Sequence, residues 1–588
     1  MARLDPHSYA DDTHARTKSL DWKARVDFAA RVIHAEVTLR FAAPSPAGPL
    51  DLDTRGLHVD AIEAANGAAL PFTMHEAEPV LGSRLEITLP AGTESLVVRY
   101  HTSTDASALQ WLTPEQTLGK KHPYLFSQCQ AIHARSVVPC QDTPALRVTY
   151  DAALDVPAEL RAVMAAAPVA REGREVKAGR AIERFTMPQP IPPYLLAFAV
   201  GDLASKDLSP RSRVWAEPAQ LEVAAWEFEH VEAHIEAAEA LFGPYDWERF
   251  DLLVMPPSFP YGGMENPRLT FLTPSLIAGD RTLVNVVAHE LAHSWTGNLV
   301  TNTTAEHFWL NEGFTVFAER RILEALEGEE MGALHAAIGF EKLQQAFEQL
   351  AATPDLTKLR THLAGIDPDE AFSAVPYEKG YLFLKTIEAA VGRAKFDELL
   401  AAWLGAFRFG SANTDDFLAI AEKVLPGVLA SHRVDAKAWI DGAGLPATYW
   451  KPESARLTAL EAVAGRVPTK EEAATWTSTE WHLYLEAMPK PSPLDVCTEL
   501  DAEYSLTSAK NPEVLVSWLT LACHSGYAAV LPRAEEMVAR FGRMKYLKPI
   551  YRALASRPET KPLAQGLFDK HRASYHPIAQ QVLRLVVK

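Results

Sequence analysis

The stretch V-A-H-E-L-A-H-S-W, from Val287 to Trp295, holds two histidines four residues apart and a glutamate directly after the first. Side chains four apart lie on one face of a helix, so His289 and His293 can present their imidazoles to one point. Two neutral imidazoles fill two positions around a tetrahedral Zn²⁺. Glu290 lies beside the open position, where it can take a proton from a metal-bound water. The stretch therefore predicts a helix with a hydrolytic zinc site, and the alternative is a buried helix with two ordinary histidines.

A hydrolytic zinc site needs a third protein ligand and one open position. Eighteen residues separate His293 from Glu312, which lies in the sequence W-L-N-E-G-F. Apolar residues with helical spacing follow it: Phe314, Val316, Phe317, Ile322 and Leu323. Glu312 therefore begins a second predicted helix, and its carboxylate can return to the metal. We predict one Zn²⁺ per chain, bound by His289, His293 and Glu312.

The composition is that of an ordinary soluble globular protein, with 588 residues, 48% of them hydrophobic and 22% charged. A net charge of −18 argues against a surface that binds nucleic-acid phosphates. The chain shows no secretory signal and no run near the roughly 18 apolar residues of a membrane span. Its four cysteines have no C-x-x-C spacing and are too few for a disulfide framework. We therefore expect a cytoplasmic monomer with neither nucleic acid nor membrane as a partner.

Strand patterns dominate the chain up to residue 202, because apolar and polar residues alternate over 37–41, 85–89 and 146–150. Helix and strand patterns then mix around the zinc motif. After a Pro-bearing linker the periodicity is helical to the end, and the spacing of its prolines suggests stacked helix pairs. We predict an α+β multidomain fold with a β-rich domain over 1–202, a catalytic domain over 203–446, a linker over 447–454 and an α-helical domain over 455–588.

H-E-L-A-H, the spacing to W-L-N-E-G and the preceding G-G-M-E-N together resemble the zinc aminopeptidases of peptidase family M1. Four more segments resemble the branch of that family that holds the leukotriene A4 hydrolases and related bacterial aminopeptidases: C-Q-A-I-H (129–133), P-C-Q-D-T-P (139–144), V-P-Y-E-K-G (375–380) and G-R-M-K (542–545). The resemblance covers nearly the whole chain. It implies an N-terminal antiparallel β saddle, a thermolysin-like zinc catalytic domain and a C-terminal, solenoid-like α-helical domain.

An aminopeptidase must hold the free α-ammonium of its substrate, and a carboxylate in a Gly-rich loop can do this by a charge-assisted hydrogen bond. The resemblance assigns this role to Glu265. It also assigns stabilisation of the oxyanion to Tyr377, since a phenol can donate to the charge that develops on the attacked carbonyl. From the sequence alone, an exposed loop glutamate and a packed tyrosine are the simpler interpretations. The loop before Glu265 completes this part of the expected substrate site: Pro260, Tyr261, Gly262, Gly263 and Met264.

Two further segments are implied in substrate binding. Gln128, Cys129 and Gln130 form one, and their polar groups suit a peptide backbone; a thiol nucleophile at Cys129 is the alternative. Arg543, Met544 and Lys545 form the other, and in the resembling proteins this stretch binds the substrate carboxylate. A bidentate arginine would suit a peptide C-terminus and would favour short peptides. In isolation, the same pair of charges would be interpreted as a solvated basic face.

Glu319 and Asp369 are weaker candidates. Glu319 lies seven residues after Glu312, on the same helix face, and can orient a zinc ligand. Asp369 matches an acidic residue that leukotriene A4 hydrolases use in epoxide opening, whereas Phe372 stands where those enzymes carry a tyrosine. We therefore predict a zinc aminopeptidase that acts on short peptides with a free N-terminus. The alternatives are an epoxide hydrolase on a lipid such as leukotriene A4, a thermolysin-type endopeptidase and a non-catalytic zinc scaffold.

Overall fold

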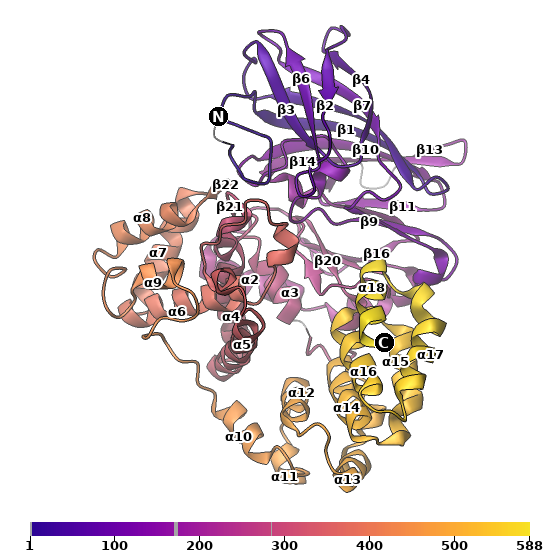
Figure 1. Ribbon diagram of the computed structural model, residues 1–588, viewed down its shortest axis with the longest axis vertical. Coiled ribbons are helices and arrows are strands. Elements are labelled where there is room, and N and C mark those ends of the chain that lie inside the picture. The colour runs from indigo at the N-terminus through magenta and orange to yellow at the C-terminus, as the bar shows by residue number, and fades with distance from the viewer. Residues whose placement is uncertain (1–2, 170–173, 284) are drawn as a thin grey trace.

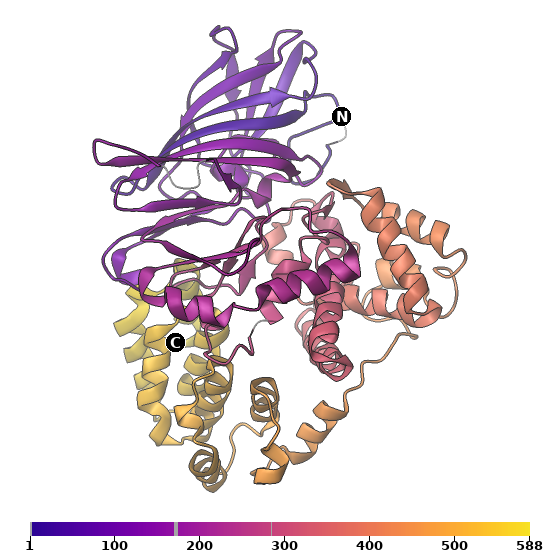
Figure 2. The same cartoon turned by 180° about the vertical axis from the view of Figure 1, so that it is seen from behind.

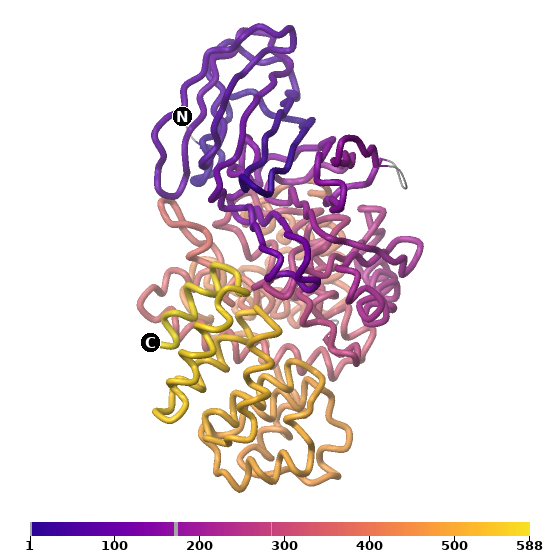
Figure 3. The backbone as a smooth tube through the Cα atoms, turned by 90° about the vertical axis from the view of Figure 1, so that its right-hand side faces the viewer, coloured from indigo at the N-terminus to yellow at the C-terminus, as the bar shows by residue number. Residues whose placement is uncertain are grey.

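The computed structural model describes residues 3–169, 174–283 and 285–588; residues 1–2, 170–173 and 284 lie outside the description. Figure 1 shows strands at the top of the molecule, mixed structure in the middle and helices at the lower right. Seen from the side, the N-terminal strands and the helices around residues 455–505 lie at opposite ends of the long axis (Figure 3). The predicted succession of a β-rich, a mixed and a helical part is confirmed. The domain limits near 202, 446 and 454 stay predictions.

The N-terminal part contains one large sheet, with strand order β12-β14-β10-β1-β2-β7-β4 and β13 paired to β14. Its strands are β1 (Thr17–Asp27), β2 (Val32–Phe41), β4 (His58–Ala64), β7 (Ser95–His101), β10 (Val148–Pro157), β12 (Ala167–Pro168), β13 (Glu175–Lys177) and β14 (Arg180–Ile191). Alternate residues of β2 are buried, as the predicted pattern requires. The expected antiparallel pairing holds for these strands except between β1 and β10, which run parallel. Such a pair needs a long crossover connection, and residues 28–147 provide it.

Two smaller sheets complete this part of the molecule. One consists of β3 (Gly48–Thr54), β5 (Phe72–Met74) and β6 (Ser83–Leu89), and the other has the order β11-β15-β9-β8. The strands of the second are β8 (Leu109–Leu112), β9 (Tyr124–Ser127), β11 (Arg161–Met164) and β15 (Phe198–Gly201). Their apolar faces share one core with the catalytic part of the chain. The N-terminal sheets are therefore fixed against the catalytic part.

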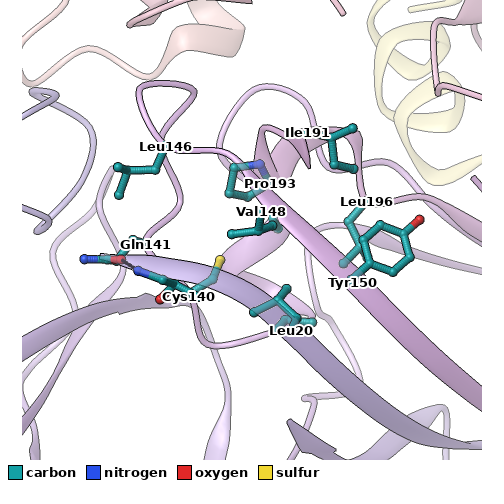
Figure 4. A pocket seen from close by; sticks show the side chains of 12 residues that line it. Leu20, Cys140, Gln141, Leu146, Val148, Tyr150, Ile191, Pro193 and Leu196 are labelled. Carbon is teal, nitrogen blue, oxygen red and sulfur yellow. Dashed lines mark hydrogen bonds between the residues drawn. The ribbon is translucent and has the colours of Figure 1, made fainter. Parts of the chain in front are cut away.

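Figure 4 shows a small apolar cavity inside the N-terminal part, beside β1 and β10. Its volume of about 20 Å³ is close to that of a single water-sized probe. Leu20, Cys140 and Tyr150 are among the side chains that line it, and none of the predicted zinc ligands is among them. The cavity is therefore a packing defect of the β-rich core and has no part in the zinc site.

The middle part has a five-stranded sheet, which α1 (Leu221–Glu227) and α3 (Asn285–Ala292) contact, and a group of helices that lies to one side of the sheet (Figure 1). The strand order is β16-β17-β18-β20-β19, with β16 (Ala204–Asp207), β17 (Arg213–Ala216), β18 (Asp251–Val254), β19 (Gly263–Met264) and β20 (Leu269–Leu272). The other helices are α2 (Val231–Phe242), α4 (Trp309–Glu327), α5 (Glu329–Gln349), α6 (Gly380–Val391), α7 (Arg393–Ala406), α8 (Thr414–Val424) and α9 (Ala436–Asp441). Figure 2 shows α1 and α2 from behind, where they cross the molecule beneath the sheets.

The C-terminal part is entirely helical and has a core of its own. Its helices are α10 (Ala455–Val463), α11 (Lys470–Ala473), α12 (Ser478–Ala487), α13 (Leu494–Tyr504), α14 (Pro512–Ser525), α15 (Leu531–Arg540), α16 (Met544–Ala555), α17 (Lys561–His571) and α18 (Pro577–Val586). The even-numbered helices α12, α14, α16 and α18 pack in one row, and α15 and α17 pack behind α16. This arrangement confirms the predicted stack of helix pairs. Among the described residues, no helix is long and apolar enough to cross a membrane.

Candidate metal centre and substrate site

Two helices that pack against each other, α3 and α4, bring the predicted zinc ligands together. His289 lies on α3, and His293 follows the last residue of that helix. The backbone N–H of His293 still bonds to the carbonyl of His289 at 3.2 Å, so both imidazoles keep the helical spacing. Glu312 lies in the first turn of α4. A buried apolar face on each helix therefore decides where the three ligands meet.

The donor atoms of His289, His293 and Glu312 all lie within 4.8 Å of one another. Oε2 of Glu312 is 3.5 Å from Nε2 of His289 and 3.6 Å from Nε2 of His293. This oxygen is buried and accepts no hydrogen bond among the described residues. A buried carboxylate oxygen without a partner costs free energy unless a cation compensates it. Two imidazoles and one carboxylate around a common point are the donor set of a catalytic zinc site.

The outer nitrogens of both imidazoles are held by neighbouring groups. Nδ1 of His289 is 2.9 Å from Oε2 of Glu319, and Nδ1 of His293 is 3.2 Å from the carbonyl of Thr296 and 3.1 Å from Oγ1 of Thr315. These contacts leave Nε2 of each ring free for a metal. Glu319 lies where its heptad spacing from Glu312 predicts it. Sequence reasoning missed Thr296 and Thr315, because a carbonyl and a hydroxyl carry no motif.

Glu265 and Glu290 lie next to the zinc ligands, with oxygens within 4.8 Å of a nitrogen of His293. Both side chains are buried, with 4% and 6% of their surface exposed. Burial raises the pKa of Glu290 to about 8, although His289 lowers it. Burial and the charges of Glu312 and Glu290 raise the pKa of Glu265 well above its ordinary value. Three ionised carboxylates buried in one site are unfavourable unless positive charge compensates them, and a zinc ion and an ammonium group can supply that charge.

The Gly-rich loop packs directly on this carboxylate cluster. A Cβ atom on Gly263 would lie 2.3 Å from Oε1 of Glu290, so any larger residue there would displace the carboxylate of Glu290. The amide of Asn298 donates to the backbone carbonyl of Glu265 at 2.7 Å, and Nε2 of Gln130 donates to its side chain at 3.2 Å. The loop is thereby fixed from both sides of the site. Asn298 is another residue that the sequence did not single out.

Tyr377 lies beside the zinc ligands, on a π-helical turn over Val375–Lys379. Its ring stacks on that of His289 with the centroids 6.3 Å apart. Burial and the charge of Glu312 raise the pKa of Tyr377 well above its ordinary value, so the phenol keeps its proton and can donate. The buried ammonium of Lys379 holds this turn in place by donating to the carbonyls of Thr357 and Gly442 at 2.8 Å each.

The segment around Cys129 contributes amides rather than a thiol. Cys129 is 2% exposed and belongs to the core, and burial raises the pKa of its thiol. His133, the other half of the hypothetical thiol pair, instead bonds through Nε2 to Oδ2 of Asp369 at 2.8 Å. Nε2 of Gln128 donates to Sδ of Met264 at 3.0 Å. The structure therefore excludes a thiolate nucleophile here, and it leaves only the backbone of Cys129 for substrate.

The G-R-M-K segment reaches the Gly-rich loop although it lies almost 280 residues further along the chain. The N–H of Gly542 donates to the carbonyl of Pro257 at 2.7 Å, and the N–H of Met544 donates to that of Pro260 at 3.4 Å. A Cβ on Gly542 would lie 2.7 Å from Cα of Ser258, which explains the glycine. The segment brings Arg543 to the Gly-rich loop, whereas Lys545 pairs with Glu513 and the side chain of Met544 packs against the helical core.

Two imidazoles and a carboxylate around one point, with two more buried carboxylates beside them, are the site of a zinc metallopeptidase. Family models match three successive parts of the chain: the peptidase M1 N-terminal domain over residues 8–195, the peptidase family M1 domain over 226–435 and the leukotriene A4 hydrolase C-terminal domain over 476–586.

Relatives match the chain over nearly its whole length. It is 39% identical over 602 residues to leukotriene A-4 hydrolase of Xenopus laevis, with 98% of each chain covered. It is 38% identical to leucine aminopeptidase 2 of Yarrowia lipolytica, with 98% of this chain and 93% of the relative covered. The structure of native yeast LTA4 hydrolase superposes with a TM-score of 0.91 at 33% identity and covers 99% of this chain and 97% of that one. The chain belongs to peptidase family M1 and is a zinc-dependent aminopeptidase.

Proposed function

We propose that the enzyme removes single N-terminal residues from short peptides at one zinc ion held by His289, His293 and Glu312. The observation that carries this proposal is the cluster of three buried carboxylates, Glu265, Glu290 and Glu312. Zinc compensates only part of this negative charge. The free α-ammonium of a peptide supplies the rest when it lies at Glu265, and cleavage is then limited to the first residue.

Zn²⁺ bound at this site supplies a Lewis acid that polarises the scissile carbonyl and lowers the pKa of an attacking water. Glu290 accepts the proton of that water and passes it to the leaving amine. Tyr377 keeps its phenolic proton and donates it as a hydrogen bond to the oxyanion that develops on the attacked carbonyl. Glu265, oriented by Gln130 and Asn298, fixes the position of the substrate amine. The backbone and amides over 128–130 and the loop over 260–264 bind the peptide chain.

The proposed preference for short peptides rests on Arg543 and Lys545. Arg543 lies beside the Gly-rich loop that carries Glu265, and Lys545 shares the partner Glu513 with it, so a peptide held by its amine at one end can place its carboxylate at the other. A longer chain would have no carboxylate at this distance. A monomeric, cytoplasmic protein is part of the same proposal, and the four free, buried cysteines fit a reducing compartment.

Epoxide hydrolysis is the second candidate, because Asp369 is half-exposed beside an apolar pocket lined by Phe308, Leu363, Pro368 and Phe372. The volume of this pocket is about 50 Å³. Pockets that enclose drug-sized ligands measure roughly 300–1,000 Å³, so this pocket is too small to enclose a long lipid. The size of the pocket therefore favours peptides.

A panel of tripeptides, each with a free or acetylated N-terminus and assayed with and without a zinc chelator, tests the proposal. We expect release of the first residue only, from free termini only, and only while the metal is present. Cleavage of acetylated peptides would contradict the role of Glu265 and point to an endopeptidase. Turnover of leukotriene A4 with no turnover of any peptide would show that epoxide hydrolysis, and not peptide hydrolysis, is the activity of this site.

A further inference from the structure

One nitrogen of the Arg543 guanidinium, Nη1, is hydrogen-bonded within the protein. Its Nη1 donates to Oγ of Ser275 at 2.9 Å, to the hydroxyl of Tyr546 at 3.2 Å and to Oε1 of Glu513 at 3.3 Å. Its Nη2 lies next to Gly262, where an added Cβ would be 3.4 Å away. The guanidinium is therefore oriented with Nη1 toward the helical core and Nη2 toward the Gly-rich loop.

Glu513 is the acidic centre of this cluster. Its Oε1 accepts a hydrogen bond from the hydroxyl of Tyr546 at 2.9 Å, and its Oε2 lies 2.7 Å from Nζ of Lys545. Only 9% of the residue is exposed. Burial raises its pKa, but the charges of Lys545 and Arg543 outweigh burial and lower the pKa to about 2. One ionised carboxylate thus holds both cations of the G-R-M-K segment.

The helix that carries Glu513 is itself tied to the catalytic part of the molecule. Glu513 lies in the first turn of α14, where the side-chain oxygen of Asn511 accepts from its backbone N–H at 3.0 Å. The side-chain amide of Asn511 donates to Oδ2 of Asp280 at 3.0 Å and to Oγ1 of Thr282 at 2.8 Å. Asp280 and Thr282 lie in the segment that leads into α3. The position of Glu513 is therefore fixed relative to the zinc helix.

We propose that Glu513 is a positioning residue of the carboxylate site at the substrate C-terminus. It neutralises one of the two cations, so the cluster of Arg543, Lys545 and Glu513 keeps a single net positive charge, which matches a single substrate carboxylate. It also holds Nη1 of Arg543 away from the substrate and leaves Nη2 free to bind it. Glu513 does not touch the substrate. This inference rests on the proposed role of Arg543 and Lys545.

Kinetics on matched substrates test this role. A tripeptide with a free C-terminal carboxylate and the same tripeptide as its C-terminal amide are compared in the wild type, Glu513→Ala and Glu513→Gln. We expect Glu513→Ala to raise the ratio of KM for the acid to KM for the amide by at least about tenfold, because an arginine and a lysine lose their common partner. Glu513→Gln keeps an oxygen acceptor for Nη1 and for Tyr546, so its ratio should rise less.

Glu480→Ala is the matched control. Glu480 is also buried near the start of a C-terminal helix and also pairs with an arginine, Arg456 at 3.1 Å, but it lies outside the cluster. This variant should keep the KM ratio of the wild type. An unchanged or lower ratio in both Glu513 variants, with normal melting curves, would overturn the inference.

Arg543→Ala distinguishes the proposed carboxylate site from the proposed role of Glu513 in it. If it raises the KM ratio and Glu513→Ala does not, the carboxylate site exists and only the role of Glu513 is wrong. If Arg543→Ala changes KM for the acid and the amide equally, neither Arg543 nor Glu513 recognises the C-terminus. The peptidase activity on the amide is measured in every variant and reports whether the zinc site is intact.

Discussion

At the scale of single residues, the site is decided by where buried charge is placed. Glu290 follows His289 directly in sequence, and its side chain packs against Gly263. It does not contact the outer nitrogen of either imidazole. The outer nitrogen of His289 is taken by Glu319 and that of His293 by Thr296 and Thr315. Glu290 is thus not engaged in orienting either imidazole, as the proposed role in proton transfer requires.

Glu290→Gln should keep the zinc and lose nearly all hydrolysis. The amide has the shape of the carboxylate but cannot accept the proton of the attacking water, and general-base catalysis contributes roughly 10²–10⁴-fold to rate. Metal analysis and peptide turnover on the same preparation check both expectations. Glu327→Gln, at the far end of α4, is the control. Full activity in Glu290→Gln would refute the mechanism.

At the scale of elements, the short strand β19 decides how the substrate loop meets the zinc helix. β19 pairs with β20 through Gly263 and Met264, so the strand continues into Glu265 with a fixed register. Gly263 lies against the side chain of Glu290 on α3, where an added Cβ would displace the carboxylate. This glycine therefore connects the strand that leads to Glu265 with the side chain of Glu290.

Gly263→Ala should reduce turnover more than it reduces stability. The added methyl group forces Glu290 or the strand to move, and small displacements in an active site can cost about 10²-fold in rate. Gly262→Ala is the comparison, because its Cβ would meet Arg543 at 3.4 Å, an ordinary contact distance. Turnover of the two variants, measured with their melting temperatures, distinguishes the cases. Equal losses in both would show that the contact of Gly263 with Glu290 has no special effect on turnover.

At the scale of the whole molecule, the C-terminal helices are joined to both other parts. Besides the contacts of Asn511 and Arg543 with the catalytic part, Nε2 of Gln116 donates to the carbonyl of Tyr575 at 3.1 Å. His576 hydrogen-bonds through Nε2 to Oε1 of Gln110. Figure 1 shows the result, in which the chain passes α10 to α13 at the bottom and returns through α14 to α18 toward the strands. The proposed substrate site thereby has segments from all three parts around it.

We expect protonation of His576 at low pH to destabilise the contact between the C-terminal helices and the N-terminal part. Burial lowers its pKa to about 4, whereas an imidazole in the unfolded chain titrates near 6.5. Between these values the unfolded chain binds more protons, so stability falls as the pH is lowered from 7 toward 4. The contribution of His576 to this loss is about 2 kcal/mol between pH 8 and pH 5.

His576→Asn isolates that contribution. Asparagine can still cap α18, as Nδ1 of His576 does by accepting from the N–H of Ile578 at 3.2 Å, but it does not titrate. Denaturation by urea at pH 8 and pH 5 should show a smaller loss of stability in the variant than in the wild type. Equal losses in both proteins would mean that His576 is not buried in its neutral form.

The sequence by itself determined the order of the β-rich, mixed and helical parts, and it predicted the three zinc ligands and the neighbouring base that the structure brings close together. It could do so because helix periodicity fixes which side chains share a face, and because a zinc site needs few residue types at short spacings. The family resemblance added Glu265, Tyr377 and the G-R-M-K segment, which lie too far apart along the chain for spacing to connect them.

Only the tertiary structure decided how these groups are held. The oxygens of Thr296 and Thr315 on His293, the amide of Asn298 behind Glu265 and the carboxylate of Glu513 between Arg543 and Lys545 have no sequence signature. Such contacts join residues from different elements, and they depend on the packing of whole helices and sheets rather than on local periodicity. The parallel pair β1 and β10 was missed for the same reason, since its partners are more than a hundred residues apart.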